Sequence, residues 1–225
     1  MARITPAKLR FALTQMAELT GENKFVVIGR GSLAVTAPEH LRGLALTDDI
    51  DLWPRNNETA ALDECIQRYG SDSEFYLENG FYIERVGEWT LMTQPKGWEN
   101  RATEFKTGEI TALILGLSDL IYNKLEAFRV KDQEFLSEAF AKGLADPEEI
   151  QRFIEEYAPN EERRTLLLKN LELVKPKKNK RESTGQAIDA SMSAVRHIEP
   201  AETLGDAPSS NGPGKTSSGR RVPER

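Results

Sequence analysis

The pattern of hydrophobic and polar residues differs between the two halves of the chain. Before about residue 116 the apolar residues form short runs broken by glycine and proline, which predicts strands. After that point they recur every three to four residues, which predicts helices. Strands are expected at residues 25–28, 49–53, 81–83, 89–92 and 110–115, and helices at residues 5–20, 58–69, 119–141, 147–157 and 161–174. Strands first and mainly helices afterwards indicate the α+β (mixed α/β) class with a helical C-terminal half.

Aromatic residues divide the chain into a folded part and a tail. All 17 Phe, Trp and Tyr residues precede Lys175. The remaining segment is rich in Gly, Pro and Ser, and cannot bury enough apolar surface to offset its ordering entropy. We therefore expect a sheet domain at residues 1–116, a helical region at 117–174 that packs on it and contributes to the site, and a disordered C-terminal tail at 175–225.

Charge follows the same division, because the net charge of −6 is the sum of an acidic body and a basic tail. Residues 1–174 hold 30 acidic and 20 basic side chains, whereas residues 175–225 hold six and ten. An acidic body argues against broad nonspecific nucleic-acid binding, so an RNA partner would need a local basic patch or the help of the tail.

Several classes of protein are excluded by composition. No apolar run reaches the roughly 18 to 20 residues of a membrane helix, and the N-terminus lacks a signal-peptide pattern. Cys65 alone permits neither an internal disulfide nor a cysteine zinc cluster, and His40 and His197 are too few for a histidine metal site. We expect a cytoplasmic protein without a membrane partner, in which any metal would be a hard cation held by carboxylates.

Asp49 and Asp51 are the first candidate site residues. In a strand, residues i and i+2 lie on the same face with Cα atoms about 6.5 Å apart. The two aspartates therefore project together, Ile50 and Leu52 face the core, and Asp48 points to the opposite face. Two carboxylates this close can share a divalent cation, although an isolated Asp-x-Asp more often lies at the end of a strand without binding a metal.

The second candidate is the turn after the first predicted strand, Gly29-Arg30-Gly31-Ser32. Glycine lets backbone N–H groups approach a phosphate closely, and a following helix N-terminus favours an anion. Arg30 adds a cation and Ser32 a hydroxyl. A tight turn from strand to helix needs glycine anyway, so this sequence alone is weak evidence for a phosphate site.

The third candidate lies on the long helix expected at 119–141. Its apolar stripe contains Asp132 between Phe128 and Phe135, with Lys124 and Lys131 beside the stripe and Arg129 on the other flank. A core-facing carboxylate is costly unless it is paired. Asp132 forms either a structural ion pair, with Arg129 or another arginine, or part of a polyphosphate site in which it orients a lysine or activates an acceptor hydroxyl.

Three passages together resemble the nucleotidyltransferase superfamily with the DNA polymerase beta-like fold. They are Val27-Ile28-Gly29-Arg30-Gly31-Ser32-Leu33, Leu46-Thr47-Asp48-Asp49-Ile50-Asp51-Leu52-Trp53-Pro54, and the segment from Asp119 to Asp132. The last is similar to the Lys-Leu-x-Ala-x-Arg-x-Lys-Asp signature of minimal bacterial nucleotidyltransferases that include AbiEii-like toxins of type IV toxin-antitoxin systems. Pro95 to Arg101 is similar to a Gly-Trp-x-x-Arg passage of a largely uncharacterised branch.

The resemblance implies a small mixed sheet flanked by helices and a role for each candidate residue. The aspartates match carboxylates that bring Mg²⁺ or Mn²⁺ to a nucleoside triphosphate, with Glu84 or Glu104 as the third ligand. The glycine turn matches the loop that holds the phosphates. Residues matching the nucleotide site of the toxin branch are Lys124 and Asp132, with Arg129 and Lys131 beside them.

The implied activity is transfer of a nucleoside monophosphate from the triphosphate to a hydroxyl acceptor. By analogy with the toxins, the acceptor is RNA such as tRNA, and a cognate antitoxin protein is a further partner. The family commonly has Gly-Ser or Gly-Gly after the first strand, whereas here Arg30 follows Gly29. This bulky cation leaves a second interpretation open, a non-catalytic nucleotide-binding or regulatory module on the same scaffold.

Overall fold

The computed structural model describes residues 3–55, 61–87 and 90–176 of the 225-residue chain. The disordered tail expected at 175–225 therefore lies outside the described residues, apart from Lys175 and Pro176. The described elements, in chain order, are α1 (Pro6–Thr20), β1 (Lys24–Ile28), η1 (Arg30–Ser32), α2 (Leu33–Thr36), η2 (Glu39–Ala45), β2 (Asp49–Pro54), α3 (Leu62–Tyr69), α4 (Glu74–Asn79), β3 (Tyr82–Arg85), α5 (Trp98–Arg101), β4 (Thr103–Thr107), β5 (Ile110–Ile114), α6 (Leu117–Ala127), α7 (Val130–Ala141), α8 (Pro147–Tyr157) and α9 (Glu161–Val174).

The strands form one mixed sheet in the order β3-β2-β1-β5-β4. Strand β1 pairs antiparallel with β2 and parallel with β5, β3 runs parallel to β2, and β4 runs antiparallel to β5. These elements confirm the mixed α+β class with a helical C-terminal half that the hydrophobic pattern predicted.

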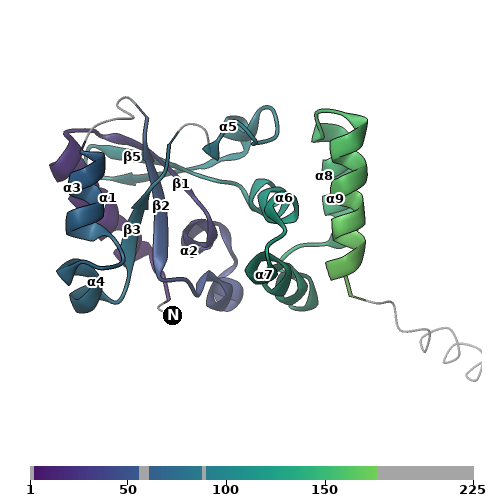
Figure 1. Cartoon of the computed structure of the whole chain (residues 1–225), viewed down its shortest axis with the longest axis horizontal. Helices are drawn as coiled ribbons and strands as arrows, with labels where there is room; N and C mark the ends of the chain where they lie inside the picture. The colour runs from purple at the N-terminus through teal and green to yellow at the C-terminus, as the bar shows by residue number, and fades with distance from the viewer. Residues whose placement is uncertain (1–2, 56–60, 88–89, 177–225) are drawn as a thin grey trace, which may run out of the picture. The chain divides into compact units, whose positions relative to one another are not determined.

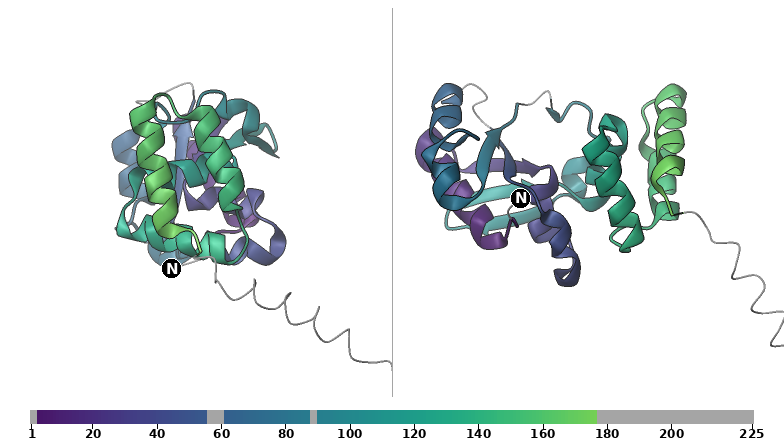
Figure 2. Two further views of the ribbon diagram at one scale, coloured as in Figure 1. Left: turned by 90° about the vertical axis from the view of Figure 1, so that its right-hand side faces the viewer. Right: turned by 60° about the horizontal axis from the view of Figure 1, so that its bottom comes forward.

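Helices cover both faces of this sheet (Figures 1 and 2). Phe25 and Val27 of β1 pack into a cluster with α1, α3 and α4, whereas Val26 and Ile28 pack into a second cluster with α2 and α6 to α9. A strand buried on both sides has no polar face, which is why β1 is a continuous apolar run. Among the described helices, none is long and apolar enough to cross a membrane.

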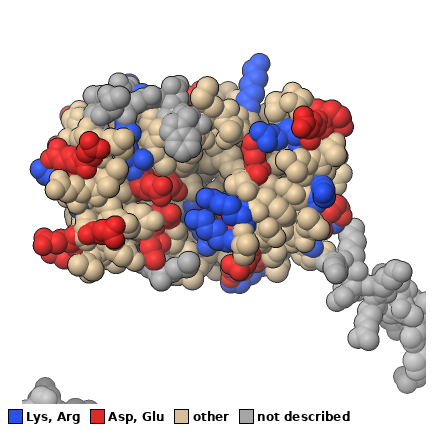
Figure 3. Space-filling view, viewed as in Figure 1, with Lys and Arg blue, Asp and Glu red and all other residues tan. Residues whose placement is uncertain are grey.

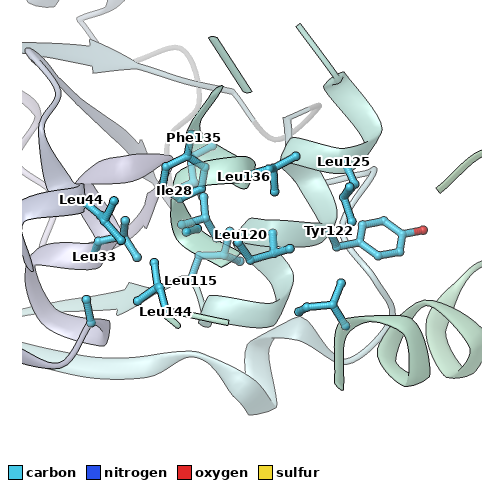
Figure 4. Close-up of a cluster of buried hydrophobic side chains, with 14 of the residues drawn as sticks. Ile28, Leu33, Leu44, Leu115, Leu120, Tyr122, Leu125, Phe135, Leu136 and Leu144 are labelled. Carbon is cyan, nitrogen blue, oxygen red and sulfur yellow. The ribbon is translucent and has the colours of Figure 1, made fainter. Parts of the chain in front are cut away.

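The second cluster joins the helical region to the sheet (Figure 4). Ile28 and Leu33 come from β1 and α2, and they belong to the same buried cluster as Leu120 of α6 and Phe135 and Leu136 of α7. Each fully buried side chain of this size contributes about 1.5 to 3 kcal/mol. The end of β1 and the start of α7 are therefore held in a fixed relation.

Local sequence explains the elements that the pattern predicted correctly. Thr5 caps α1 by accepting from the Lys8 N–H, and Gly21 ends that helix in a left-handed conformation. Asp146 and Asn160 cap α8 and α9 in the same way. Helix α3 begins at Leu62, later than expected, and residues 56–60 of its predicted start lie outside the described residues.

Two of the predicted elements were wrong. Thr90 is 3-10 helical and residues 91–93 form a turn instead of the strand expected at 89–92, and Trp89 is outside the described residues. The single helix expected at 119–141 is two helices, α6 and α7, because Phe128 adopts a left-handed conformation (φ 43°) that ends α6. Arg129 is extended and is the N-cap residue of α7, and its backbone N–H donates to the Asp132 carboxylate at 3.3 Å.

Candidate active site

Three carboxylates converge on the face of the sheet formed by β2 and β3. The parallel register places Asp51 beside Glu84 and Asp49 beside Tyr82, so alternation brings all four side chains to one face. Carboxylate oxygens of Asp49, Asp51 and Glu84 lie within 4.8 Å of one another. Such a set of hard oxygen donors suits Mg²⁺ or Mn²⁺.

Glu104, the other candidate for a third ligand, lies elsewhere. It belongs to β4, at the opposite edge of the sheet from β3, and its carboxylate forms an exposed ion pair with Lys106 at 2.7 Å. The structure therefore brings Glu84, and not Glu104, to the two aspartates.

Asp51 is the most perturbed member of the triad. Burial, together with the negative charges of Asp49 and Glu84, raises its pKa from 3.8 to about 7, although Lys124 and Lys131 act in the opposite direction. A carboxyl group whose pKa lies this far above its usual value has too little positive charge nearby to stabilise its ionised form. A divalent cation between the three carboxylates would supply that charge.

Gly29 brings the turn after β1 directly against Asp51. Its φ is +65°, and a Cβ atom built there would lie 1.9 Å from Asp51 Oδ2. Any larger residue would displace the carboxylate, so glycine is required for both backbone conformation and space. Gly31 has no such restriction, because its Cβ would meet only ordinary contacts.

The Ser32 hydroxyl stabilises this turn from within. Ser32 is fully buried, and its hydroxyl donates to the Gly29 carbonyl at 2.8 Å. Its position differs from that of the hydroxyl donor expected in a phosphate site, because the oxygen faces its own loop.

Lys124 and Asp132 form a buried ion pair between α6 and α7. Lys124 Nζ lies 3.0 Å from Asp132 Oδ1, and Arg129 Nε lies 2.7 Å from Asp132 Oδ2. The Asp132 side chain has 0% exposure and that of Lys124 has 14%. Burial alone would raise the pKa of Asp132, but the Arg129 hydrogen bond and the Lys124 charge hold it below its usual value. Asp132 is thus a fixed anion that sets the position of Lys124.

Arg30 links the glycine turn to two other elements. Its guanidinium donates to the Lys131 carbonyl at 2.8 Å and to the Leu46 carbonyl at 3.4 Å, and it lies 4.9 Å from the centroid of the Phe135 ring. The charge is therefore held against α7 and the end of η2.

Acidic and basic groups face one cavity of about 200 Å³. Its lining residues are Arg30, Thr47, Asp48, Asp49, Asp51, Tyr82, Lys124, Lys131 and Asp132. Figure 3 shows a compact group of basic side chains next to acidic ones near the middle of the face in view. Lys124 and Lys131 thus meet at one cavity although they belong to different helices. Among the other candidate site residues, Gly29, Gly31, Ser32, Glu84 and Arg129 are not lining residues of this cavity.

Asp48 also lines this cavity, contrary to the expectation that it faces away. It precedes β2, whose first residue is Asp49, and strict alternation does not extend beyond the strand. Its carboxylate adds to the negative potential on that side of the cavity.

Two further lining residues escaped the sequence analysis. The Thr47 hydroxyl donates to Asp49 Oδ1 and so orients that carboxylate. Burial, with the nearby charges of Asp49, Glu84, Asp51 and Asp48, raises the pKa of Tyr82 to about 12. In the sequence, Tyr82 and Glu84 alternate with the buried residues Phe81 and Ile83, which is the pattern of two side chains on one face of a strand. The pairing of β3 with β2 is what places that face beside the aspartates.

A mixed sheet with a glycine turn against an Asp-x-Asp strand, completed by a third carboxylate, is the arrangement of a nucleotidyltransferase. Comparison with family models gives the same class. Residues 7–181 match the family described as nucleotidyltransferase of unknown function (DUF6036), and the chain belongs to this family. No curated protein and no solved structure matched the chain.

Proposed function

We propose that this chain is a divalent-metal-dependent nucleotidyltransferase that moves a nucleoside monophosphate from a nucleoside triphosphate to a hydroxyl acceptor. One observation carries the proposal: Asp49 and Asp51, two members of the carboxylate cluster that Glu84 completes, line the same cavity as the cations Lys124 and Lys131. The family to which the chain belongs supports the general class of reaction.

Asp49, Asp51 and Glu84 would hold Mg²⁺ or Mn²⁺. They offer only hard oxygen donors within one small volume, and a bound cation would lower the pKa of Asp51, which burial and the two neighbouring acids raise. A metal bound at such a site supplies charge neutralisation and orientation to the reacting phosphate. The Thr47 hydrogen bond fixes the direction of the Asp49 carboxylate.

Lys124 and Lys131 would offset the negative charge of the triphosphate. Asp132, already ionised and fully paired, is a poor proton acceptor, so we assign it the role of positioning Lys124. Gly29 allows the backbone of the turn to reach the phosphates next to Asp51. Arg30 holds that turn against α7 by donating to the Lys131 carbonyl. Arg129 helps to hold the Asp132 carboxylate in place through their ion pair.

The size of the cavity favours phosphate groups over a whole nucleotide. Its volume of about 200 Å³ lies below the range of roughly 300 to 1,000 Å³ found for pockets that enclose entire ligands. In the reaction the acceptor oxygen forms a bond to the α-phosphorus, the bond to the bridging oxygen breaks, and pyrophosphate leaves. The acceptor proton passes to solvent water.

RNA, including tRNA, is our proposed acceptor, in line with the resemblance to the toxin branch. If the chain is a toxin with a cognate antitoxin, its expression should arrest growth, and Asp49→Ala should abolish the arrest. Growth arrest by both forms would argue against a toxic activity that depends on this site.

Incubation of the purified protein with Mg²⁺, α-labelled nucleoside triphosphates and total cellular RNA tests the activity. We expect transfer of label to RNA with release of pyrophosphate, and a loss of at least about 100-fold in Asp51→Asn, because removing a preorganised charge from such a site has effects of this size. Glu104→Gln is the matched control, since it changes an acid of the same sheet outside the site. Transfer that persists in Asp51→Asn contradicts the assignment, and nucleotide binding without turnover would indicate the non-catalytic module.

A further inference from the structure

The joint between α6 and α7 deprives one backbone carbonyl of its helical partner. In a continuous helix the Arg129 N–H would donate to the Leu125 carbonyl, four residues earlier. Because α6 ends before Phe128, that N–H donates instead to the Asp132 carboxylate at 3.3 Å. Leu125 is fully buried, so its carbonyl needs a donor from elsewhere in the fold.

Asn170 of α9 supplies that donor. Its side-chain Nδ2 donates to the Leu125 carbonyl at 2.9 Å, and the bond is buried. Asn170 is only 6% exposed. The other buried residues of α9 are Leu167, Leu171 and Val174. A polar amide on such an apolar face lowers stability unless it is hydrogen-bonded, so the bond to α6 accounts for an asparagine at this position.

Gln133 of α7 makes a second bond of the same kind. Its side-chain Nε2 donates at 3.0 Å to the carbonyl of Phe128, the left-handed residue between the two helices. The Phe128 N–H donates to the Lys124 carbonyl at 3.0 Å and closes the last turn of α6. Two side-chain amides, one from α7 and one from α9, therefore bond to backbone carbonyls of the joint.

An ion pair also ties α9 to the last turn of α6. Arg163 Nη2 lies 2.8 Å from Glu126 Oε1, and the Glu126 side chain is largely buried. Glu126 follows Leu125, the residue whose carbonyl accepts from Asn170. The last turn of α6 is thus held from α9 at two neighbouring residues.

Lys124 belongs to this turn, and its side chain lines the acidic cavity. Its Nζ lies 3.0 Å from Asp132 Oδ1, so the amine and its anion come from opposite sides of the joint. The position of the amine therefore depends on how α6 ends and how α7 begins. Asn170 and Gln133 are not lining residues of the cavity, so they can affect a ligand there only through the joint.

We propose that Asn170 and Gln133 are positioning residues of the nucleotidyl-transfer site. Their amides hold the joint between α6 and α7 in the conformation that directs Lys124 towards the phosphates of the triphosphate. This inference rests on the proposed function, in which Lys124 offsets the charge of those phosphates. It gives α9 a role in the site although no residue of α9 lines the acidic cavity.

Two binding measurements on the full chain test this inference. Calorimetry with inorganic tripolyphosphate and Mg²⁺ probes the cations of the cavity, and electron paramagnetic resonance with Mn²⁺ probes its carboxylates. Asn170→Leu and Gln133→Met remove the amide donors without adding charge. Each variant should bind tripolyphosphate about tenfold or more weakly than the wild type, because a hydrogen bond to a charged group contributes about that factor. Both should bind Mn²⁺ as the wild type does, which a general loss of structure would not allow.

Two control variants separate positioning from stability. Leu167→Ala removes a buried side chain from α9 without removing a bond to the joint, so it should lower stability and leave tripolyphosphate binding by the folded protein unchanged. Gln151→Met changes an exposed glutamine of α8 whose amide donates to Glu155, and it should bind as the wild type does.

The inference is overturned if Gln133→Met, the less buried of the two changes, binds tripolyphosphate as the wild type does. It is also overturned if Leu167→Ala weakens that binding equally, or if the loss of tripolyphosphate binding is matched by a loss of Mn²⁺ binding. Failure of the wild type to bind tripolyphosphate would contradict the proposed function itself, and the inference with it. Normal binding by the wild type and by both amide variants would overturn the inference alone.

Discussion

Asp51 is the side chain on which the candidate site depends most. It touches the backbone of the turn at Gly29 and shares its surroundings with Asp49 and Glu84, and its pKa is about 7. Burial of the Asp51 carboxylate, and then its repulsion from Asp49 and Glu84, destabilise the metal-free protein when Asp51 is ionised. The folded state therefore retains a proton on Asp51 at pH values where the unfolded chain has lost it.

The stability of the metal-free protein should consequently fall as the pH rises from about 4 to about 7, because in this range the folded state binds more protons than the unfolded state. Asp51→Asn removes this penalty and should raise the free energy of unfolding at about pH 8 by on the order of 2 kcal/mol. Urea unfolding with a chelator, at about pH 5 and about pH 8, measures the effect. Equal pH dependence in wild type and Asp51→Asn would contradict it, and Glu104→Gln serves as the control.

Alternation along a single strand was enough to predict that Asp49 and Asp51 share a face and that Ile50 and Leu52 are buried. The choice of Glu84 over Glu104, and the presence of Tyr82, depend on the parallel pairing of β2 with β3. Strand pairing is a long-range property, so local sequence does not contain it. The hydrogen bond from Thr47 to Asp49 depends on the bend before β2 in the same way.

At the level of elements, the break between α6 and α7 gives Asp132 its position. Apolar spacing continues across Phe128, which is why the sequence predicted one helix. A phenylalanine in the left-handed conformation has no sequence signal of the kind that glycine gives, and arginine is not a usual helix cap. Burial of Asp132 was predicted correctly, whereas its place in the first turn of a second helix was not.

Asp132→Asn should lower the free energy of unfolding by about 3 to 5 kcal/mol, because it leaves the largely buried Lys124 without its anion. Thermal or urea unfolding measures the loss. Glu138→Gln changes an exposed ion pair with Lys142 in the same helix and should cost at most about 1 kcal/mol. Similar losses in the two variants would show that the Lys124–Asp132 pair does not carry the stability assigned to it.

At the scale of the whole molecule, an acidic protein holds a local group of cations next to a cluster of carboxylates. The net charge of −6 does not reveal this arrangement, because Arg30, Lys124 and Lys131 come from separate elements that only the fold brings to one cavity. The order of strands and helices, together with the three sequence passages, was enough to predict the class of fold and the nucleotidyltransferase superfamily, but not the branch within it. Where the cations meet the carboxylates follows from the packing of α6 and α7 against the end of β1.

Binding of Mn²⁺, followed by electron paramagnetic resonance, tests the central claim most directly, since it requires neither the identity of the nucleotide nor that of the acceptor. Wild-type protein and Glu104→Gln should bind Mn²⁺ with equal affinity, Glu84→Gln should bind it more weakly, and Asp51→Asn should lose it. Failure of the wild type to bind Mn²⁺, or equal binding by Asp51→Asn, would contradict the proposal that these three carboxylates form the metal site of a nucleotidyltransferase.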